Sequence, residues 1–226
     1  MLDIVGNVLA PHYCCSCGEI GTVFCDYCKY DIICDPFERC IMCLGPVEDR
    51  GAHCSRCAAP YVRAWCVAER AGAVKVLIDA FKFDGLRGAA KPLGEFISSA
   101  LPDLPDNLVI ASVPTVSTHI RQRGYDHAAL IAREVARQRG VKYQALLKRR
   151  TTTVQQGARR KERLKQAEGA FEAVRRIDGG TVLIIDDIFT TGATLHYAAT
   201  TLLAAGAREV WVAVAARQPL DDPVSL

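Results

Sequence analysis

The chain has 226 residues, half of them hydrophobic, and a net charge of only +3 at pH 7. This length can hold one ordinary domain and a smaller one, and the hydrophobic share predicts a packed core. No apolar run reaches the roughly 18 residues of a membrane-spanning helix, and residues 1–11 lack the pattern of a secretory signal. The composition argues against stable membrane insertion and export, so we expect a cytoplasmic protein.

Residues 1–11 place Leu2, Val5, Val8 and Leu9 at the spacing of a short amphipathic helix. We expect this helix to pack against the core of the protein itself. The alternative is a peripheral position at the inner face of the membrane. That alternative is weaker because no Lys or Arg lies beside the apolar residues.

Cysteine usage is the next feature along the chain. All eleven cysteines lie between Cys14 and Cys66, and eight form Cys-x-x-Cys pairs: Cys14/Cys17, Cys25/Cys28, Cys40/Cys43 and Cys54/Cys57. Zn²⁺ takes four thiolates in a tetrahedron, and each pair presents two from one turn, which predicts two structural zinc sites. An iron–sulfur cluster and disulfides are the alternatives; disulfides fit poorly because they would need an export signal.

The grouping of the four pairs is open between a sequential and an interleaved arrangement. Intervals of 7 and 10 residues between neighbouring pairs favour two sequential sites. A module of about 60 residues buries little surface, so the metal is expected to stabilise it. We therefore expect a double zinc ribbon over residues 1–60 and a second domain over residues 61–226.

Strands and helices are predicted to alternate through residues 61–226. We expect strands at residues 61–71, 108–113, 145–149, 182–186 and 210–215. We expect helices at residues 74–83, 90–101 and 125–139. Residues 115–124 predict a polar loop, and residues 151–163 a mobile basic loop that runs into a helix. This alternation predicts an α/β fold with a mostly parallel sheet flanked by helices.

The strand expected at residues 182–186 is followed by polar residues that could bind a ligand. Asp186 and Asp187 follow a run of four apolar residues, and a turn follows with Thr190, Thr191, Gly192, Ala193 and Thr194 before an amphipathic helix. Such a turn can direct backbone N–H groups at an anion, and carboxylates there can bind sugar hydroxyls or a hydrated metal ion. An ordinary capped helix is the simpler interpretation, but it does not explain two adjacent acids.

A second segment of interest follows the strand expected at residues 108–113. It comes after Val113 and Pro114 and contains Arg121, Arg123 and Gly124. The arginines offer bidentate donors and the glycine allows close backbone approach, which suits a pyrophosphate group; an ordinary basic loop is the alternative. Residues 118–176 hold 16 Lys/Arg and 5 Asp/Glu. Solvated helix faces explain part of this charge, and the rest favours a pyrophosphate, nucleotide or nucleic-acid partner.

The segment 182–194 resembles the signature of the type I phosphoribosyltransferases, which bind phosphoribosyl pyrophosphate (PRPP). The resemblance implies that Asp186 and Asp187 contact the ribose hydroxyls and that Thr190 to Thr194 hold the 5′-phosphate. The whole chain resembles the ComF family, which is named for competence and DNA uptake. That family joins a double zinc ribbon to a phosphoribosyltransferase-like domain. Its further matching segments are Phe81-Lys82-Phe83, Val113-Pro114, Arg123-Gly124-Tyr125, Gln155-Gln156-Gly157, Arg159/Arg160, Arg163 and Gly169-Ala170-Phe171.

Two segments depart from the family pattern. The usual Arg-Gly-Phe-Asn-Gln is Arg-Gly-Tyr-Asp-His here, so Asp126 brings a negative charge that either weakens anion binding or caps the next helix. Before the basic helix, the usual Leu-Ser is Ala158-Arg159. The details of that loop therefore do not carry over from the family.

The resemblance implies a Mg²⁺-dependent phosphoribosyltransferase reaction, in which a nucleophile displaces pyrophosphate from PRPP. Arg121, Arg123 and Lys82 would stabilise the leaving group, and Asp187 is the candidate to accept a proton from the nucleophile. The alternative is a non-catalytic factor that binds single-stranded DNA or DNA-uptake proteins and uses the sugar-phosphate site as sensor or scaffold. A third hypothesis gives the zinc ribbons a protein-docking role alone. The sequence identifies neither the acceptor nor the oligomeric state.

Overall fold

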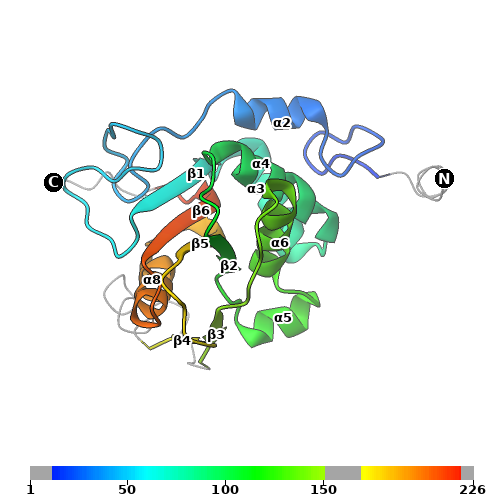
Figure 1. The fold of residues 1–226 in the computed structure, drawn as a ribbon. Coiled ribbons are helices and arrows are strands. Elements are labelled where there is room, and N and C mark those ends of the chain that lie inside the picture. The colour runs from blue at the N-terminus through cyan, green and yellow to red at the C-terminus, as the bar shows by residue number, and fades with distance from the viewer. Residues whose placement is uncertain (1–11, 151–168, 220–226) are drawn as a thin grey trace.

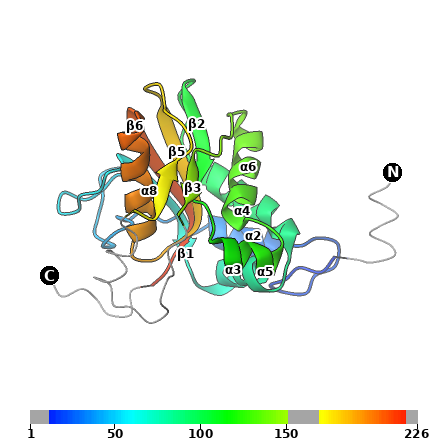
Figure 2. The same ribbon diagram turned by 90° about the horizontal axis from the view of Figure 1, so that it is seen from below.

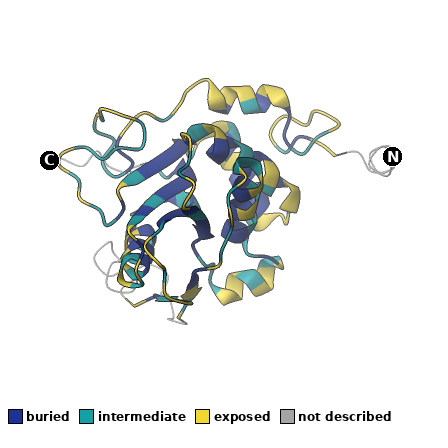
Figure 3. Ribbon diagram, viewed as in Figure 1, coloured by how far each residue is buried: buried dark blue, intermediate teal, exposed yellow. Residues whose placement is uncertain are grey.

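A parallel sheet of four strands forms the centre of the computed structural model, which describes residues 12–150 and 169–219 (Figure 1). The strand order is β1-β6-β5-β2. The strands are β1 (Arg63–Glu69), β2 (Leu108–Ser112), β5 (Thr181–Phe189) and β6 (Glu209–Arg217), and all three pairings are parallel. Their near-continuous apolar sequences allow burial on both faces (Figure 3). The expected α/β fold with a parallel sheet is confirmed.

Helices cover the two faces of this sheet (Figure 2). On one face lie α3 (Gly72–Phe83), the 3₁₀ turn η1 (Arg87–Ala89), α4 (Ala90–Ala100) and α6 (His127–Arg139); α8 (Ala193–Ala204) lies on the other. Successive buried side chains of β5 point to opposite faces of the sheet. Leu183 and Ile185 join the core under α3, α4 and α6, while Val182 and Ile184 join the core under α8. The sheet therefore separates two hydrophobic cores.

The cysteine-rich residues run beside the sheet from the α3/α4 face toward the α8 face (Figure 1). Helix α2 (Asp26–Ile33) carries Cys28 of the first cysteine cluster, and the chain continues from it to the second cluster. Residues around the first cluster, Cys14 and Phe24 among them, belong to the core under α3 and α4. Ile41, inside the second cluster, belongs to the core under α8. In the described part of the chain, no helix combines the length and the apolar composition needed to cross a bilayer.

Four of the expected strands and all three expected helices are present, with ends that shift by a few residues. The strand expected at residues 145–149 is β3 (Leu147–Arg149), but it pairs antiparallel with β4 (Phe171–Ala173) in a separate sheet. The polar loop expected at residues 115–124 is wrong: residues Ser117–Arg123 form helix α5. This helix has no buried residue, so it leaves no apolar periodicity in the sequence. The predictions for residues 1–11 and 151–163 lie outside the described residues.

Candidate functional site

Several charged side chains meet near the carboxyl ends of β5 and β2. Asp187 is 3% exposed, and its Oδ2 lies 2.9 Å from Lys82 Nζ and 2.8 Å from His127 Nε2. Lys82 comes from the last turn of α3, and His127 is the first residue of α6. Burial alone would raise the pKa of Asp187, but Lys82 and His127 together lower it below its usual value. Asp187 is therefore an ionised, paired carboxylate.

Both ring nitrogens of His127 have polar neighbours. Arg123 Nη1 lies 3.1 Å from His127 Nδ1. Thr115 Oγ1 lies 3.3 Å from the same nitrogen, and His127 Nε2 faces Asp187. Arg123 thereby orients the imidazole toward the buried carboxylate.

Asp186 behaves differently from its neighbour. Desolvation and the adjacent negative charge of Asp187 raise the pKa of Asp186 to about 7, against the attraction of His127 and Lys82. The backbone N–H of Asp187 donates to Asp186 Oδ1 over 2.9 Å. Ligand atoms of His127, Asp186 and Asp187 lie within 4.8 Å of one another, so the group is able to hold a metal ion. Two adjacent carboxyls thus have opposite pKa shifts at one edge of the sheet.

Two further residues, His127 and Arg149, lie near these carboxylates and were not expected from the sequence. His127 replaces a neutral amide of the family pattern, and that substitution was the available signal. Arg149, at the end of β3, lies with its guanidinium 5.3 Å from the centre of the Phe171 ring. Burial lowers the pKa of Arg149, and the charge of Asp186 opposes this shift. Its position depends on the β3–β4 pairing, which no local pattern indicates.

The turn after β5 has the geometry of an anion site. Gly192 adopts φ +76° and precedes the first turn of α8, while Thr191 Oγ1 accepts a bond from the Ala193 N–H over 3.4 Å. Among the described residues, no acceptor is found for the N–H groups of Thr190, Thr191 and Gly192. These donors, at the amino end of a helix, favour a bound anion such as a phosphate.

The expected pyrophosphate residues are only partly brought together. Arg121 and Arg123 lie in the last turn of α5, and Gly124 ends that helix with φ +78°. Arg123 turns toward His127, whereas Arg121 is exposed. Asp126 Oδ1 accepts the Ala129 N–H over 3.1 Å, so of the two expectations for Asp126, the helix cap is confirmed.

The eight paired cysteines form two clusters that could each hold a metal ion: Cys14, Cys17, Cys25 and Cys28 make one, and Cys40, Cys43, Cys54 and Cys57 the other. The sequential grouping is confirmed. The Sγ–Sγ distance between Cys14 and Cys28 is 3.8 Å, and between Cys43 and Cys54 it is 3.4 Å. A tetrahedral site with bonds of about 2.3 Å needs sulfurs about 3.8 Å apart, so these donors fit such an ion.

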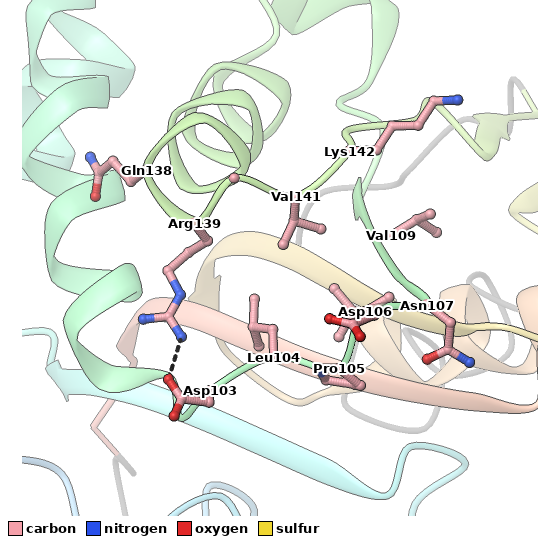
Figure 4. Close-up of a pocket in the computed structure, with 12 residues that line it drawn as sticks. Asp103, Leu104, Pro105, Asp106, Asn107, Val109, Gln138, Arg139, Val141 and Lys142 are labelled. Carbon is pink, nitrogen blue, oxygen red and sulfur yellow. Dashed lines mark ion pairs between the residues drawn. The ribbon is translucent and has the colours of Figure 1, made fainter.

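A large groove lies away from Asp186, Asp187 and the cysteine clusters (Figure 4). It measures about 840 Å³ and is lined by residues 103–109 and 138–142. Asp103 and Arg139 form an ion pair across it at 3.9 Å. These segments belong to the start of β2 and the end of α6, so the groove opens at the amino edge of the sheet, opposite Asp186 and Asp187.

Comparisons with known proteins point in one direction. The family described as "Phosphoribosyl transferase domain" matches residues 123–224. The DNA utilization protein YhgH of Salmonella typhi is 28% identical over 187 residues, which cover 76% of this chain and 81% of that protein. The competence protein ComFC of Bacillus subtilis is 29% identical over 141 residues, 59% of this chain and 55% of that protein. Competence protein F of Haemophilus influenzae is 25% identical, covering 78% of this chain and 83% of that protein.

Solved structures give more distant matches. The allosteric regulatory enzyme of purine biosynthesis aligns with a TM-score of 0.41 and 23% identity, over 57% of this chain and 25% of that chain. A hypoxanthine phosphoribosyltransferase from Staphylococcus aureus aligns with a TM-score of 0.36 and 14% identity, over 63% of this chain and 68% of that chain.

Proposed function

The chain belongs to the ComF/YhgH family of proteins with a phosphoribosyl transferase domain, and from this premise we propose that it binds PRPP at the carboxyl edge of its sheet. The observation that carries the proposal is the pair Asp186 and Asp187 next to the Thr190–Thr194 turn. The end of β5 and the turn after it thus supply acceptors for ribose hydroxyls and donors for the 5′-phosphate. We further propose that the protein acts in DNA utilization, as the names of its relatives indicate.

The cations near Asp187 suit the pyrophosphate group of PRPP. Lys82 contacts Asp187 and Arg123 contacts His127, while Arg121 and Gly124 lie at the end of α5. We propose that these residues bind pyrophosphate. The carboxyl oxygens of Asp186 and Asp187 suit a hydrated Mg²⁺ that arrives with PRPP. When bound, Mg²⁺ would neutralise charge on the leaving pyrophosphate.

If the protein is a transferase, Asp186 is better suited than Asp187 to accept a proton from the nucleophile. A general base works best when its pKa lies near the operating pH, and in the absence of a bound cation desolvation and the charge of Asp187 raise the pKa of Asp186 to about 7. Asp187, the candidate favoured by the sequence, is held ionised by Lys82 and His127. Its proposed role is to orient the ribose.

The two cysteine clusters are proposed to hold structural Zn²⁺, because each offers four thiols whose sulfurs lie within 4.8 Å of one another. The division into a metal-stabilised module over residues 1–60 and a phosphoribosyltransferase-like domain over residues 61–226 is part of this proposal. A cytoplasmic location, with peripheral membrane contact as the alternative, stays a prediction.

Calorimetric titration with Mg-PRPP tests the site. The variant Asp186→Asn/Asp187→Asn should lose binding, because both ribose acceptors lose their charge. The matched control Asp103→Asn/Asp106→Asn removes two carboxylates at the opposite edge of the sheet and should bind like the wild-type protein (Figure 4). Normal binding by the first variant, or none by folded, zinc-loaded wild type, would overturn the proposal.

The second candidate function is binding of single-stranded DNA or DNA-uptake proteins without catalysis. The names of the relatives and the 16 Lys/Arg within residues 118–176 favour it. Fluorescence anisotropy with a labelled oligonucleotide should then show affinity that falls steeply with salt. Competition by Mg-PRPP would place DNA at the same site; undisturbed DNA binding would separate the two functions.

A further inference from the structure

Arg217, the last residue of β6, is fully buried and makes an unusual set of contacts. Its Nε donates to the carbonyl oxygen of Ile41 over 2.6 Å, and its Nη2 donates to that of Met42 over 3.2 Å. Its Nη1 donates to the Gln218 carbonyl over 2.9 Å. Ile41 and Met42 are the two residues between Cys40 and Cys43. A guanidinium at the end of the sheet therefore holds the turn that presents two thiols of the second cluster.

Charge explains why an arginine is tolerated there. A buried cation is costly unless hydrogen bonds and opposite charge compensate it. The carbonyl oxygens supply the hydrogen bonds. Four thiolates around one Zn²⁺ carry a net charge of about −2, so the loaded second cluster would supply the opposite charge.

The same residue reaches the proposed phosphate turn through Phe189. Arg217 pairs with Phe189 between β6 and β5, and the N–H of Gln218 donates to the Phe189 carbonyl over 2.8 Å. The Phe189 ring is 2% exposed and lies under Gly192: a Cβ at Gly192 would come within 2.6 Å of it. Ile41 and Phe189 belong to the same core. A short path of contacts thus runs from the second cluster to the turn.

We propose that Arg217 is a positioning residue that couples metal binding at Cys40, Cys43, Cys54 and Cys57 to the conformation of the Thr190–Thr194 turn. Metal at this cluster holds the Ile41–Met42 carbonyls in place, Arg217 holds the ends of β6 and β5, and the turn keeps its anion-binding shape. The identity of the anion, PRPP, rests on the proposed function; the coupling itself does not.

The first test needs no ligand and no variant. Zinc is removed stepwise from the wild-type protein with a chelator, and hydrogen exchange is followed by mass spectrometry. Peptides around residues 14–28 and 40–57 report the two clusters separately. Exchange in residues 189–195 should rise at least fivefold with loss of metal from the second cluster. Unchanged exchange in residues 189–195 when that cluster is empty would overturn the proposal.

The second test uses reciprocity. If metal binding and PRPP binding are coupled, each ligand must raise the affinity for the other by the same factor. Saturating Mg-PRPP should therefore raise the zinc affinity of the second cluster at least fivefold, and zinc should raise the PRPP affinity equally. Arg217→Met should abolish this factor and Arg217→Lys should restore part of it. Arg208→Met, which removes a half-exposed guanidinium next to the start of β6, should keep it. Equal factors in Arg217→Met and wild type would overturn the proposal, whereas a wild type that binds no PRPP would overturn the proposed function and leave the exchange test standing.

Discussion

The two four-cysteine clusters are built from similar Cys-x-x-Cys motifs, but the residues around them pack on opposite faces of the sheet. Around the first, Phe24 packs edge-on against Phe96 of α4, with ring centres 5.9 Å apart, in the core under α3 and α4. Inside the second, Ile41 enters the core under α8, and Arg217 bonds to the backbone between the cysteines. The core contacts around the first cluster are apolar, whereas the second cluster adds a buried charge next to the proposed phosphate turn. Similar metal motifs can therefore be coupled differently to the rest of the protein.

Loss of one cysteine from each cluster should give the largest effects. Cys28→Ala and Cys43→Ala should each lose one equivalent of zinc, measured by elemental analysis. Structural zinc contributes on the order of 10–16 kcal/mol in small modules, comparable with the total stability of about 5–15 kcal/mol of a domain. Cys43→Ala should also destabilise the sheet, reported by the fluorescence of the packed pair Trp65 and Trp211. Full zinc content in either variant would contradict the assignment of its cluster.

The apolar anchors of the clusters come next in size. Phe24 and Ile41 are each 1% exposed. Phe24→Ala should cost about 3–5 kcal/mol and Ile41→Ala about 2–5 kcal/mol in urea unfolding, because each leaves a cavity. Although the costs are similar, only Ile41→Ala should weaken Mg-PRPP binding. Equal loss of binding in both variants would break the contrast between the clusters.

Ionisation of Asp186 makes the free energy of unfolding depend on pH. Its pKa is raised from 3.8 to about 7, so the folded state binds more protons than the unfolded state between these values. Its contribution to stability is present below about pH 4 and is lost as the pH rises through about 7. Wild type should lose on the order of 2 kcal/mol between pH 5 and 8, less than the full shift implies because the side chain is partly exposed.

Urea unfolding at several pH values measures this loss. Asp186→Asn should remove it, and an unchanged slope in that variant would show that another group causes it. If the second cluster shapes this edge, Ile41→Ala should alter the slope and Phe24→Ala should leave it as in the wild type.

Ion pairs that remain accessible to solvent should give the smallest effects. Asp49 pairs with Arg63 near the second cluster, and Glu95 pairs with Lys29 near the first, at 3.4 Å. Asp49→Asn and Glu95→Gln should each change the free energy of unfolding by no more than about 1 kcal/mol, since solvent screens such pairs. A larger loss in thermal or urea unfolding would show that surface charge, rather than packing, fixes the cysteine-rich segment.

The sequence by itself determined the features that depend on local pattern. Apolar runs of strand length predicted the sheet, and the interval between Cys-x-x-Cys pairs favoured the sequential clusters. The adjacency of Asp186, Asp187 and the Thr190–Thr194 turn is also local, so the candidate site was visible before any fold was known. The roles proposed for these residues remain predictions.

Only the tertiary structure decided which distant residues meet. Arg217 lies beyond the strand expected at residues 210–215, and its contact with Ile41 spans 176 positions. His127 and Lys82 reach Asp187 because two helices end or begin at the same edge of the sheet. Arg149 depends on the pairing of β3 with β4. Burial, ion pairing and pKa shifts arise from such long-range packing, and spacing along the chain does not encode them.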